Sequence, residues 1–355
     1  MSIYTDSPVI EVDTHGLYVE EALKAVDKAV KSADKGVYNR AYIKRNVLES
    51  VLFLKEFRKA FFLGILASLF FAFTFVFNRR MNLSGGYWLW SACLRYIFTL
   101  PVMYLLLIKD NKAKPVISAI KADVKNWILW STVGFGLFYM PLTLASVYGE
   151  SWFVAASWQI TIVAGVLLTP LFGKKIPVKS LLCSCVIIVG VFLIQTVHFG
   201  SADIKGSILA LICILIGAFS YPLGNRKMMQ YCPEELSTSQ RVFGMTLCSM
   251  PFWLVLSVIA FANAGAPSSG QAIQSFVVAL FSGVIATLLF FEATNLVKNN
   301  AKHLAFIEAT QCGEVIFTLI GGVIILGDNA PDIVGFIGIA ILIIGMIANS
   351  LVSAK

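Results

Sequence analysis

From residue 57 to the end of the chain, hydrophobic residues occur in runs of about 20 that short polar stretches separate. A helix of this length matches the hydrocarbon thickness of a lipid bilayer. The pattern predicts ten membrane-spanning helices, at residues 58–77, 86–108, 127–148, 152–172, 179–198, 206–224, 241–262, 272–292, 302–326 and 332–352. We therefore expect an all-α membrane protein.

The composition agrees with this prediction. Hydrophobic residues make up 58% of the chain and charged residues 14%, whereas soluble proteins carry about 25% charge. If the N-terminus is cytoplasmic, thirteen Lys and Arg fall in inner loops and three, Arg79, Arg80 and Lys205, in outer loops. This bias follows the positive-inside rule and predicts that both termini are cytoplasmic. The net charge of +8 thus reflects topology and does not indicate a nucleic-acid partner.

Residues 1–56 form a polar leader. Val19, Leu23, Val26 and Val30 recur at helical spacing and predict a short amphipathic helix that ends at Gly36. The string VDTHGLYVEEAL resembles the start of a small MutS-related (Smr) domain, but the likeness covers only these residues. We assign no catalysis to the leader.

Two pairs of segments indicate an internal duplication. AFTFVFNRRM, which ends at Met81, is similar to AFSYPLGNRKM, which ends at Met228. The segment GKKIPVKSLLCSCVIIVGVFLI starts at Gly173 and GDNAPDIVGFIGIAILIIGMI at Gly327, each with a proline four residues on. Five helices per copy place the second copy upside down. We expect two inverted repeats, residues 57–200 and 201–355, an arrangement typical of secondary transporters with a substrate site near the bilayer midplane.

This arrangement resembles the drug/metabolite transporter superfamily. Within it, NRRMNLSGGYWLWSACLRYIF and IEATQCGEVIFTLIGGVIIL are similar to the putative multidrug resistance efflux transporter family of bacteria. The resemblance implies a monomeric or homodimeric ten-helix bundle in the bacterial cytoplasmic membrane. It also implies export of small organic molecules, such as drug-like cations or metabolites, coupled to a proton or another cation.

The predicted ninth helix carries a polar stripe. At about 100° per residue, Glu308, Gln311 and Glu314 fall within about 120° of one another. A charge at bilayer depth costs about 2.5–3.5 kcal/mol, so such a stripe must face a cavity or a partner. Because removal from water disfavours a charged carboxylate, a proton and a cationic substrate would compete for the same group, which is the basis of antiport. Glu308 is the leading candidate.

Two other charged residues lie within predicted spans. Arg95 in the second helix forms either a structural ion pair with Glu314 or part of a gate. Glu292 lies near the inner end of the eighth helix, where its side chain either reaches the interface or takes part in transport.

Trp158 and Gln159 of the fourth helix align with the position of Glu308 in the other repeat. An aromatic face beside a carboxylate suits a lipophilic cation. A core-packing tryptophan would give the same sequence pattern, so both interpretations remain.

Several function classes lack their motifs. The chain has no phosphate-binding G-x-x-x-x-G-K-[ST] loop and no Gly-x-Ser-x-Gly elbow, and its seven cysteines show no ligand spacing. We expect no enzyme, no cofactor and no metal site. The rival functions are an amino-acid or metabolite exporter without strict proton coupling and a regulatory or scaffold membrane protein that uses the leader as a binding module.

Overall fold

The computed structural model describes residues 40–108, 111–201 and 204–353, and every regular element in these residues is a helix. Up to residue 201 the elements are α2 (Arg40–Leu83), α3 (Trp88–Ile108), α4 (Ala113–Ala122), α5 (Val124–Ser131), the π-helical η1 (Thr132–Gly136), α6 (Leu137–Tyr148), α7 (Ser151–Trp158), α8 (Ile160–Leu167), the 3-10 turn η2 (Thr169–Phe172) and α9 (Val178–Ser201).

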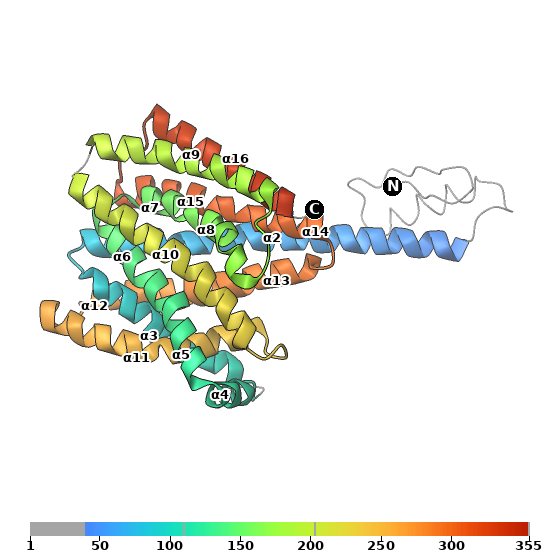
Figure 1. Ribbon diagram of the computed structural model, residues 1–355, viewed down its shortest axis with the longest axis horizontal. Helices are drawn as coiled ribbons and strands as arrows, with labels where there is room; N and C mark the ends of the chain where they lie inside the picture. The colour runs from blue at the N-terminus through green and yellow to red at the C-terminus, as the bar shows by residue number, and fades with distance from the viewer. Residues whose placement is uncertain (1–39, 109–110, 202–203, 354–355) are drawn as a thin grey trace. The chain divides into compact units, whose positions relative to one another are not determined.

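The remaining elements are α10 (Ile204–Tyr231), α11 (Thr238–Ala264), α12 (Ser269–Val278), the π-helical η3 (Ala279–Ala286), α13 (Thr287–Val297), α14 (Ala301–Ala309), the 3-10 turn η4 (Thr310–Cys312), α15 (Gly313–Gly321), the π-helical η5 (Gly322–Leu326) and α16 (Ile333–Ser353). Figure 1 shows these helices from residue 40 onward.

Nine helices of the described chain are long and apolar enough to cross a membrane, which confirms an all-α membrane protein. The predicted span at 152–172 instead forms a shorter apolar segment, Ser151–Leu167, followed by η2. Gln159 separates α7 from α8, and Pro170 lies inside η2. Because a proline lacks the amide hydrogen that continues a helix, this segment ends in an irregular turn.

The first helix begins earlier than the sequence predicts. α2 starts at Arg40, whereas the expected span starts at residue 58. Residues 40–56 contain no glycine or proline, so nothing in their sequence stops the helix. The amphipathic helix predicted to end at Gly36 lies outside the described residues.

Local interruptions occur in four of the predicted spans. The π-helical η1 falls in the third predicted span and η3 in the eighth. Gln159 interrupts the fourth predicted span, and η4 interrupts the ninth. π-helical turns often mark functional positions, because they shift side chains out of regular helical register.

Glycines allow two close helix crossings. α9 and α16 run side by side (Figure 1), and a Cβ on Gly190 would lie 2.6 Å from the backbone nitrogen of Leu342. α10 crosses η1 where a Cβ on Gly224 would collide with the backbone of Gly134. A larger side chain at either glycine would push the backbones apart.

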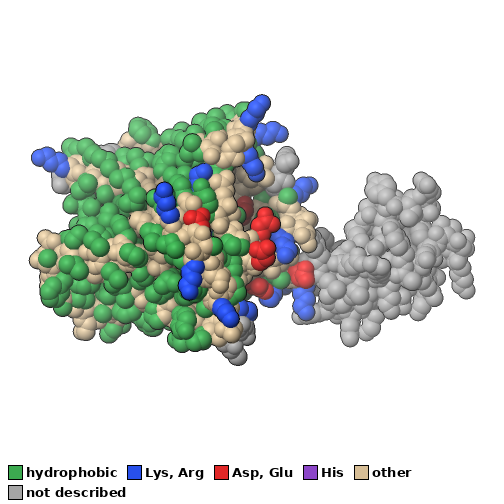
Figure 2. Space-filling model, turned by 60° about the horizontal axis from the view of Figure 1, so that its bottom comes forward, with side chains coloured by type: hydrophobic (Ala, Val, Ile, Leu, Met, Phe, Trp, Pro, Cys, Tyr) green, Lys and Arg blue, Asp and Glu red, His purple; other side chains and the backbone are tan. Residues whose placement is uncertain are grey.

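Hydrophobic side chains also cover much of the outer surface. Ile324 and Ile333 are 75% and 77% exposed, as expected for residues that face lipid. Figure 2 shows a broad area of hydrophobic side chains, with most of the visible charged side chains gathered toward one part of the molecule. The membrane-spanning helices therefore bury polar groups inside and present apolar groups outside.

Candidate functional site

A cavity of about 420 Å³ lies among the helices. Much of its wall is aromatic, with Phe75, Tyr96, Phe135, Phe138, Trp158 and Tyr221 among the lining residues. The rings of Phe138, Trp158 and Tyr221 form one cluster, with centroids 4.9–5.7 Å apart. This volume and lining are typical of sites for small organic molecules.

Arg95 is the buried cation of the cavity. Its side chain extends from α3 and is held by neutral groups: Nη1 donates to Thr74 Oγ1 at 2.9 Å and Nη2 to Ser282 Oγ at 3.3 Å. The guanidinium carbon lies 4.2 Å from the centroid of the Tyr139 ring. Hydroxyls and a π-face thus fix the plane of the guanidinium group.

A set of aromatic and amide contacts supports this arginine. The Tyr139 hydroxyl and the Asn78 amide exchange hydrogen bonds of 3.0 and 3.2 Å. The Tyr96 ring contacts Tyr139 edge to face and stacks on Trp253 with centroids 4.6 Å apart. These contacts restrict the ring on which Arg95 rests.

The polar stripe predicted for residues 308–314 faces the cavity. Glu308, Gln311 and Glu314 all line it, as do Trp158 and Gln159. Gln159 Nε2 donates to Glu314 Oε2 at 3.3 Å. The amide nitrogen of Gln311 is buried and has no hydrogen-bond partner among the described residues. The cavity therefore presents a carboxyl group and a free amide donor.

The acidic candidates differ in their surroundings. Both Glu314 and Glu308 line the cavity, but Glu314 is half-buried whereas Glu308 is exposed. Glu292 is also exposed and is not among the lining residues. The structure thus brings Glu308 and Glu314 together with Arg95, but not Glu292.

A structural ion pair between Arg95 and Glu314 was one of the two interpretations that the sequence allowed. Both line the cavity, but in the described part of the chain no ion pair joins them. The hydrogen bonds of the Arg95 guanidinium go to Thr74 and Ser282. Arg95 and Glu314 thus interact electrostatically without direct contact, and each can still bind a separate group within one cavity.

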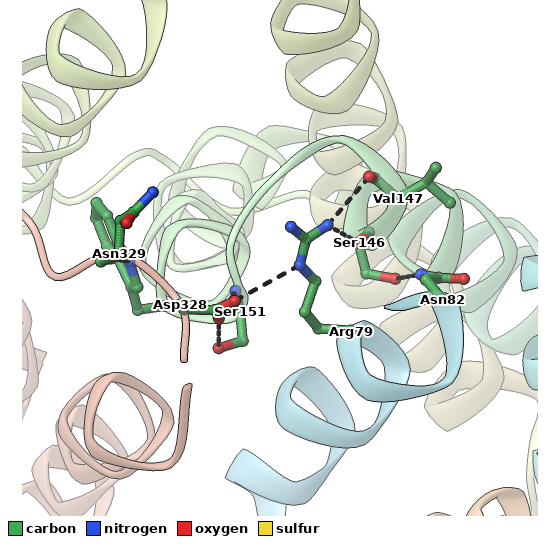
Figure 3. Close-up of polar contacts among 8 residues, drawn as sticks. Arg79, Asn82, Ser146, Val147, Ser151, Asp328 and Asn329 are labelled. Carbon is green, nitrogen blue, oxygen red and sulfur yellow. Dashed lines mark hydrogen bonds and ion pairs between the residues drawn. The ribbon is translucent and has the colours of Figure 1, made fainter. Parts of the chain in front are cut away.

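A polar cluster lies outside the cavity lining (Figure 3). Arg79 Nε lies 3.6 Å from Asp328 Oδ1, and Asp328 Oδ2 accepts hydrogen bonds from the backbone and hydroxyl of Ser151 at 2.9 and 2.7 Å. Asn82 Nδ2 donates to Ser146 Oγ at 2.7 Å. We call these five residues the Asp328 cluster.

The Asp328 cluster connects the ends of three separated segments. Arg79 Nη1 also donates to the carbonyl oxygens of Ser146 and Val147, so α2 is joined to the end of α6 as well as to the turn after η5. At about 1.5 Å per residue, Arg79 lies about 7.5 Å further along α2 than the cavity residue Thr74. The Asp328 side chain is nearly dry, at 3% exposed, whereas the Arg79 side chain is 19% exposed.

The structure also bears on metal binding. Among the described residues, no group of three or more His, Cys, Asp or Glu side chains could hold a metal ion.

Comparisons with known proteins identify the family. Residues 58–355 match the family described as "EmrE: Putative multidrug resistance efflux transporter". The chain belongs to this family. It is 46% identical over 308 residues to "Uncharacterized protein YjlA" of Bacillus subtilis (strain 168), a match that covers 83% of this chain and 95% of that protein. It is 43% identical over 267 residues to "Uncharacterized 42.1 kDa protein in intracellular alkaline protease 3'region" of Shouchella clausii, covering 72% of this chain and 70% of that protein.

The family resemblance found in the sequence is confirmed. The EmrE-family chain is a multi-pass membrane protein of a transporter family, not an enzyme. The match begins at residue 58, so the polar leader lies before it.

Sequence reasoning missed several residues of this EmrE-family transporter. Thr74 and Ser282, which bind Arg95, are small polar residues in apolar spans and carry no distinctive pattern. Asp328 could have been noticed in the sequence, although the indication is weak. It directly follows Gly327 of the repeated segment, and the chain has few acidic residues. Its pairing with Arg79 joins residues from opposite ends of the sequence.

Proposed function

We propose that this protein is a secondary active transporter that exports small organic molecules across the bacterial cytoplasmic membrane by proton antiport. The observation that carries the proposal is a cavity lined by Arg95 and Glu314 among membrane-spanning helices, with the Asp328 cluster beyond one end. Charged groups at this depth are costly and are typical of substrate or ion pathways.

Two inverted five-helix repeats are part of this proposal. The paired interruptions, η1 with η3 and Gln159 with η4, support it, because each pair falls in corresponding helices of the two predicted copies. The cavity lining extends to Asn225 and Ser350, near the C-terminal ends of α10 and α16. With cytoplasmic termini, this is the cytoplasmic side, and the Asp328 cluster closes the external side.

Alternating access then requires two events. The Asp328 cluster must open to release the substrate outside, and the cytoplasmic side must close around the same cavity. In this proposal, the conformation described here is the one that accepts substrate from the cytoplasm.

We assign the coupling role to Glu314 ahead of Glu308. Glu314 is half-buried and hydrogen-bonded by Gln159, whereas Glu308 is exposed. A coupling carboxyl must become neutral when the substrate leaves, and partial removal from water favours the neutral form. Glu308, about 9 Å nearer the start of α14 by helix rise, would then pass protons between Glu314 and the cytoplasm.

Proteoliposomes that contain a trapped pH indicator test this assignment. Addition of a lipophilic cation such as ethidium should drive protons through the wild-type protein in exchange for the cation. Glu314→Gln should abolish this exchange, and Glu308→Gln should slow it. Glu292→Gln is the matched control, since Glu292 is exposed and outside the cavity lining.

Each result has a clear consequence. Equal proton exchange in wild type and a stably inserted Glu314→Gln variant would refute coupling at Glu314. If only Glu308→Gln loses exchange, the coupling role belongs to Glu308.

A further inference from the structure

Among the described residues, no carboxylate makes a hydrogen bond or an ion pair with the guanidinium group of Arg95, although Glu314 is near enough to interact with it electrostatically. Its hydrogen-bond acceptors are the hydroxyls of Thr74 and Ser282, which lie 2.6 Å from each other, and the ring beneath it is that of Tyr139. Neutral groups orient a cation but do not neutralise it. In an apolar setting, a positive charge of this kind strongly attracts an anion.

Space is left beside this group. Gly283 lines the cavity, and a Cβ at this position would lie 3.0 Å from Thr99 Oγ1 and 3.9 Å from Arg95 Nε. An alanine here would press on the Thr99 hydroxyl and come into van der Waals contact with Arg95 Nε. The glycine therefore keeps the approach to Nε open for a bound group.

The same cavity offers groups of the opposite kind. Glu314 is available to a cation, with Gln159 holding its carboxylate, and Gln311 has an unpaired buried amide among the described residues. Phe138, Trp158 and Tyr221 supply the apolar surface. A ligand that matches all of these features carries an anionic group, an ammonium group and an apolar or aromatic body.

We propose that the cavity selects amphoteric organic molecules, with a carboxylate bound by Arg95, an amine bound at Glu314 and an aromatic body against the Phe138 cluster. This inference rests on the proposed transport function and names its substrate class. Arginine suits the role because its planar fork can bind both oxygens of a carboxylate. A purely cationic substrate would leave Arg95 without a bound anion.

Three probes that share one phenylalkyl skeleton test the proposal: L-phenylalanine carries both charges, phenethylamine only the positive one and 3-phenylpropionate only the negative one. Binding is measured calorimetrically on the full-length protein purified in detergent. We expect L-phenylalanine to bind at least about tenfold more tightly than either singly charged probe, because it gains a charge-assisted hydrogen bond at each end.

Variants locate the anionic subsite. Arg95→Gln should weaken binding of L-phenylalanine and 3-phenylpropionate by about 10- to 100-fold and leave phenethylamine within about twofold. Arg95→Lys keeps the charge but loses the fork, and should give an intermediate loss. Arg80→Gln, which removes an exposed arginine one residue after Arg79, should change nothing.

A gentler variant covers the case in which Arg95→Gln does not fold. Ser282→Ala removes one acceptor that orients the guanidinium group. We expect it to weaken 3-phenylpropionate binding severalfold without changing phenethylamine binding. An equal effect on both probes would contradict the proposal.

Other results would overturn it as well. Phenethylamine binding as tight as that of L-phenylalanine, no binding of any probe, or unchanged 3-phenylpropionate binding in Arg95→Gln would each exclude an anionic subsite at Arg95. Ethidium exchange without L-phenylalanine binding would reject this substrate class while transport stands. L-Phenylalanine binding without any proton-coupled exchange would reject the proposed function and leave the subsite.

Discussion

The two ends of the proposed repeats are similar in sequence but are held by different contacts. Arg79 near the end of α2 aligns with Arg226 near the end of α10, and Gly327 aligns with Gly173. Both glycines have left-handed φ values, +70° and +72°, directly after a short irregular turn. The next residue differs, because Asp328 follows one glycine and Lys174 follows the other.

Because of this difference, the arginine of the first copy forms an ion pair, whereas the arginine of the second copy binds only neutral groups. Arg79 pairs with Asp328 at 3.6 Å, and Asp328 is also bound by Ser151. Arg226 instead donates to the carbonyl oxygen of Gly165 at 2.6 Å and lies 5.8 Å from the ring of Phe172. At the aligned position Lys174 carries the same sign of charge as Arg226. The charge at this one position is expected to keep the external side closed and the cytoplasmic side open.

The largest effect is expected when the ion pair is broken. Asp328→Asn keeps the size of the side chain but removes its charge, leaving Arg79 without its anionic partner. Breaking a buried pair in this way costs about 3 kcal/mol, which corresponds to about 100-fold in a conformational equilibrium. We expect the external side to open.

Labelling of a cysteine at Leu142 measures this opening. Leu142 lines the cavity, and Ser146 of the Asp328 cluster lies one helical turn further along α6. With the seven native cysteines changed to alanine, a membrane-impermeant maleimide added outside intact cells should label Leu142→Cys much faster in Asp328→Asn. Arg80→Gln serves as the control. Unchanged labelling would show that the Asp328 cluster does not close the external side.

The sequence predicted the cavity-facing stripe better than it predicted the cluster. Glu308, Gln311 and Glu314 line the cavity because their spacing places them on one face of a helix, and helical spacing is a local property. The contact between Arg79 and Asp328 depends on how distant helices pack, which spacing within one segment does not encode. Arg79 was predicted only as an exception to the charge bias.

The exposure of each acidic side chain to water also could not be predicted from the sequence. A helical projection gives the direction of Glu308 and Glu314 but not the amount of water at each position. The structure leaves Glu308 exposed and Glu314 half-buried. The break at Gln159 was missed for a similar reason, because glutamine inside an apolar run does not by itself end a helix.

A steric change at the same cluster should have a smaller effect. A Cβ on Gly322 would collide with Ser151 Oγ and would lie 2.8 Å from Asp328 Oδ2. Such overpacking costs about 1–3 kcal/mol, so Gly322→Ala should increase external labelling of Leu142→Cys by about tenfold.

Gly321→Ala separates a local from a general packing effect. A Cβ on Gly321 would lie 3.0 Å from Val76 Cγ2 and meets no member of the Asp328 cluster. Both variants are expected to lower thermal stability, but only Gly322→Ala should increase labelling. Equal labelling in the two variants would assign the effect to general loosening of the helices.

The smallest effect is expected when an acidic partner is introduced for Arg226, at the cytoplasmic end. Lys174→Asp places a carboxylate at the position that aligns with Asp328, where it can pair with Arg226. Because Lys174 is exposed and Arg226 already binds Gly165, the gain is about 0.2–1 kcal/mol, or up to about fivefold.

This small gain should close the cytoplasmic side and slow maleimide labelling of Ala309→Cys, a lining residue, in inside-out vesicles. High salt should remove the effect, since exposed ion pairs are screened, while the buried Asp328 should keep the external side closed in the same salt. Lys175→Asp makes the same change in charge one residue away. If Lys175→Asp slows labelling equally, the effect comes from overall surface charge, and the aligned position has no special role in closing this end.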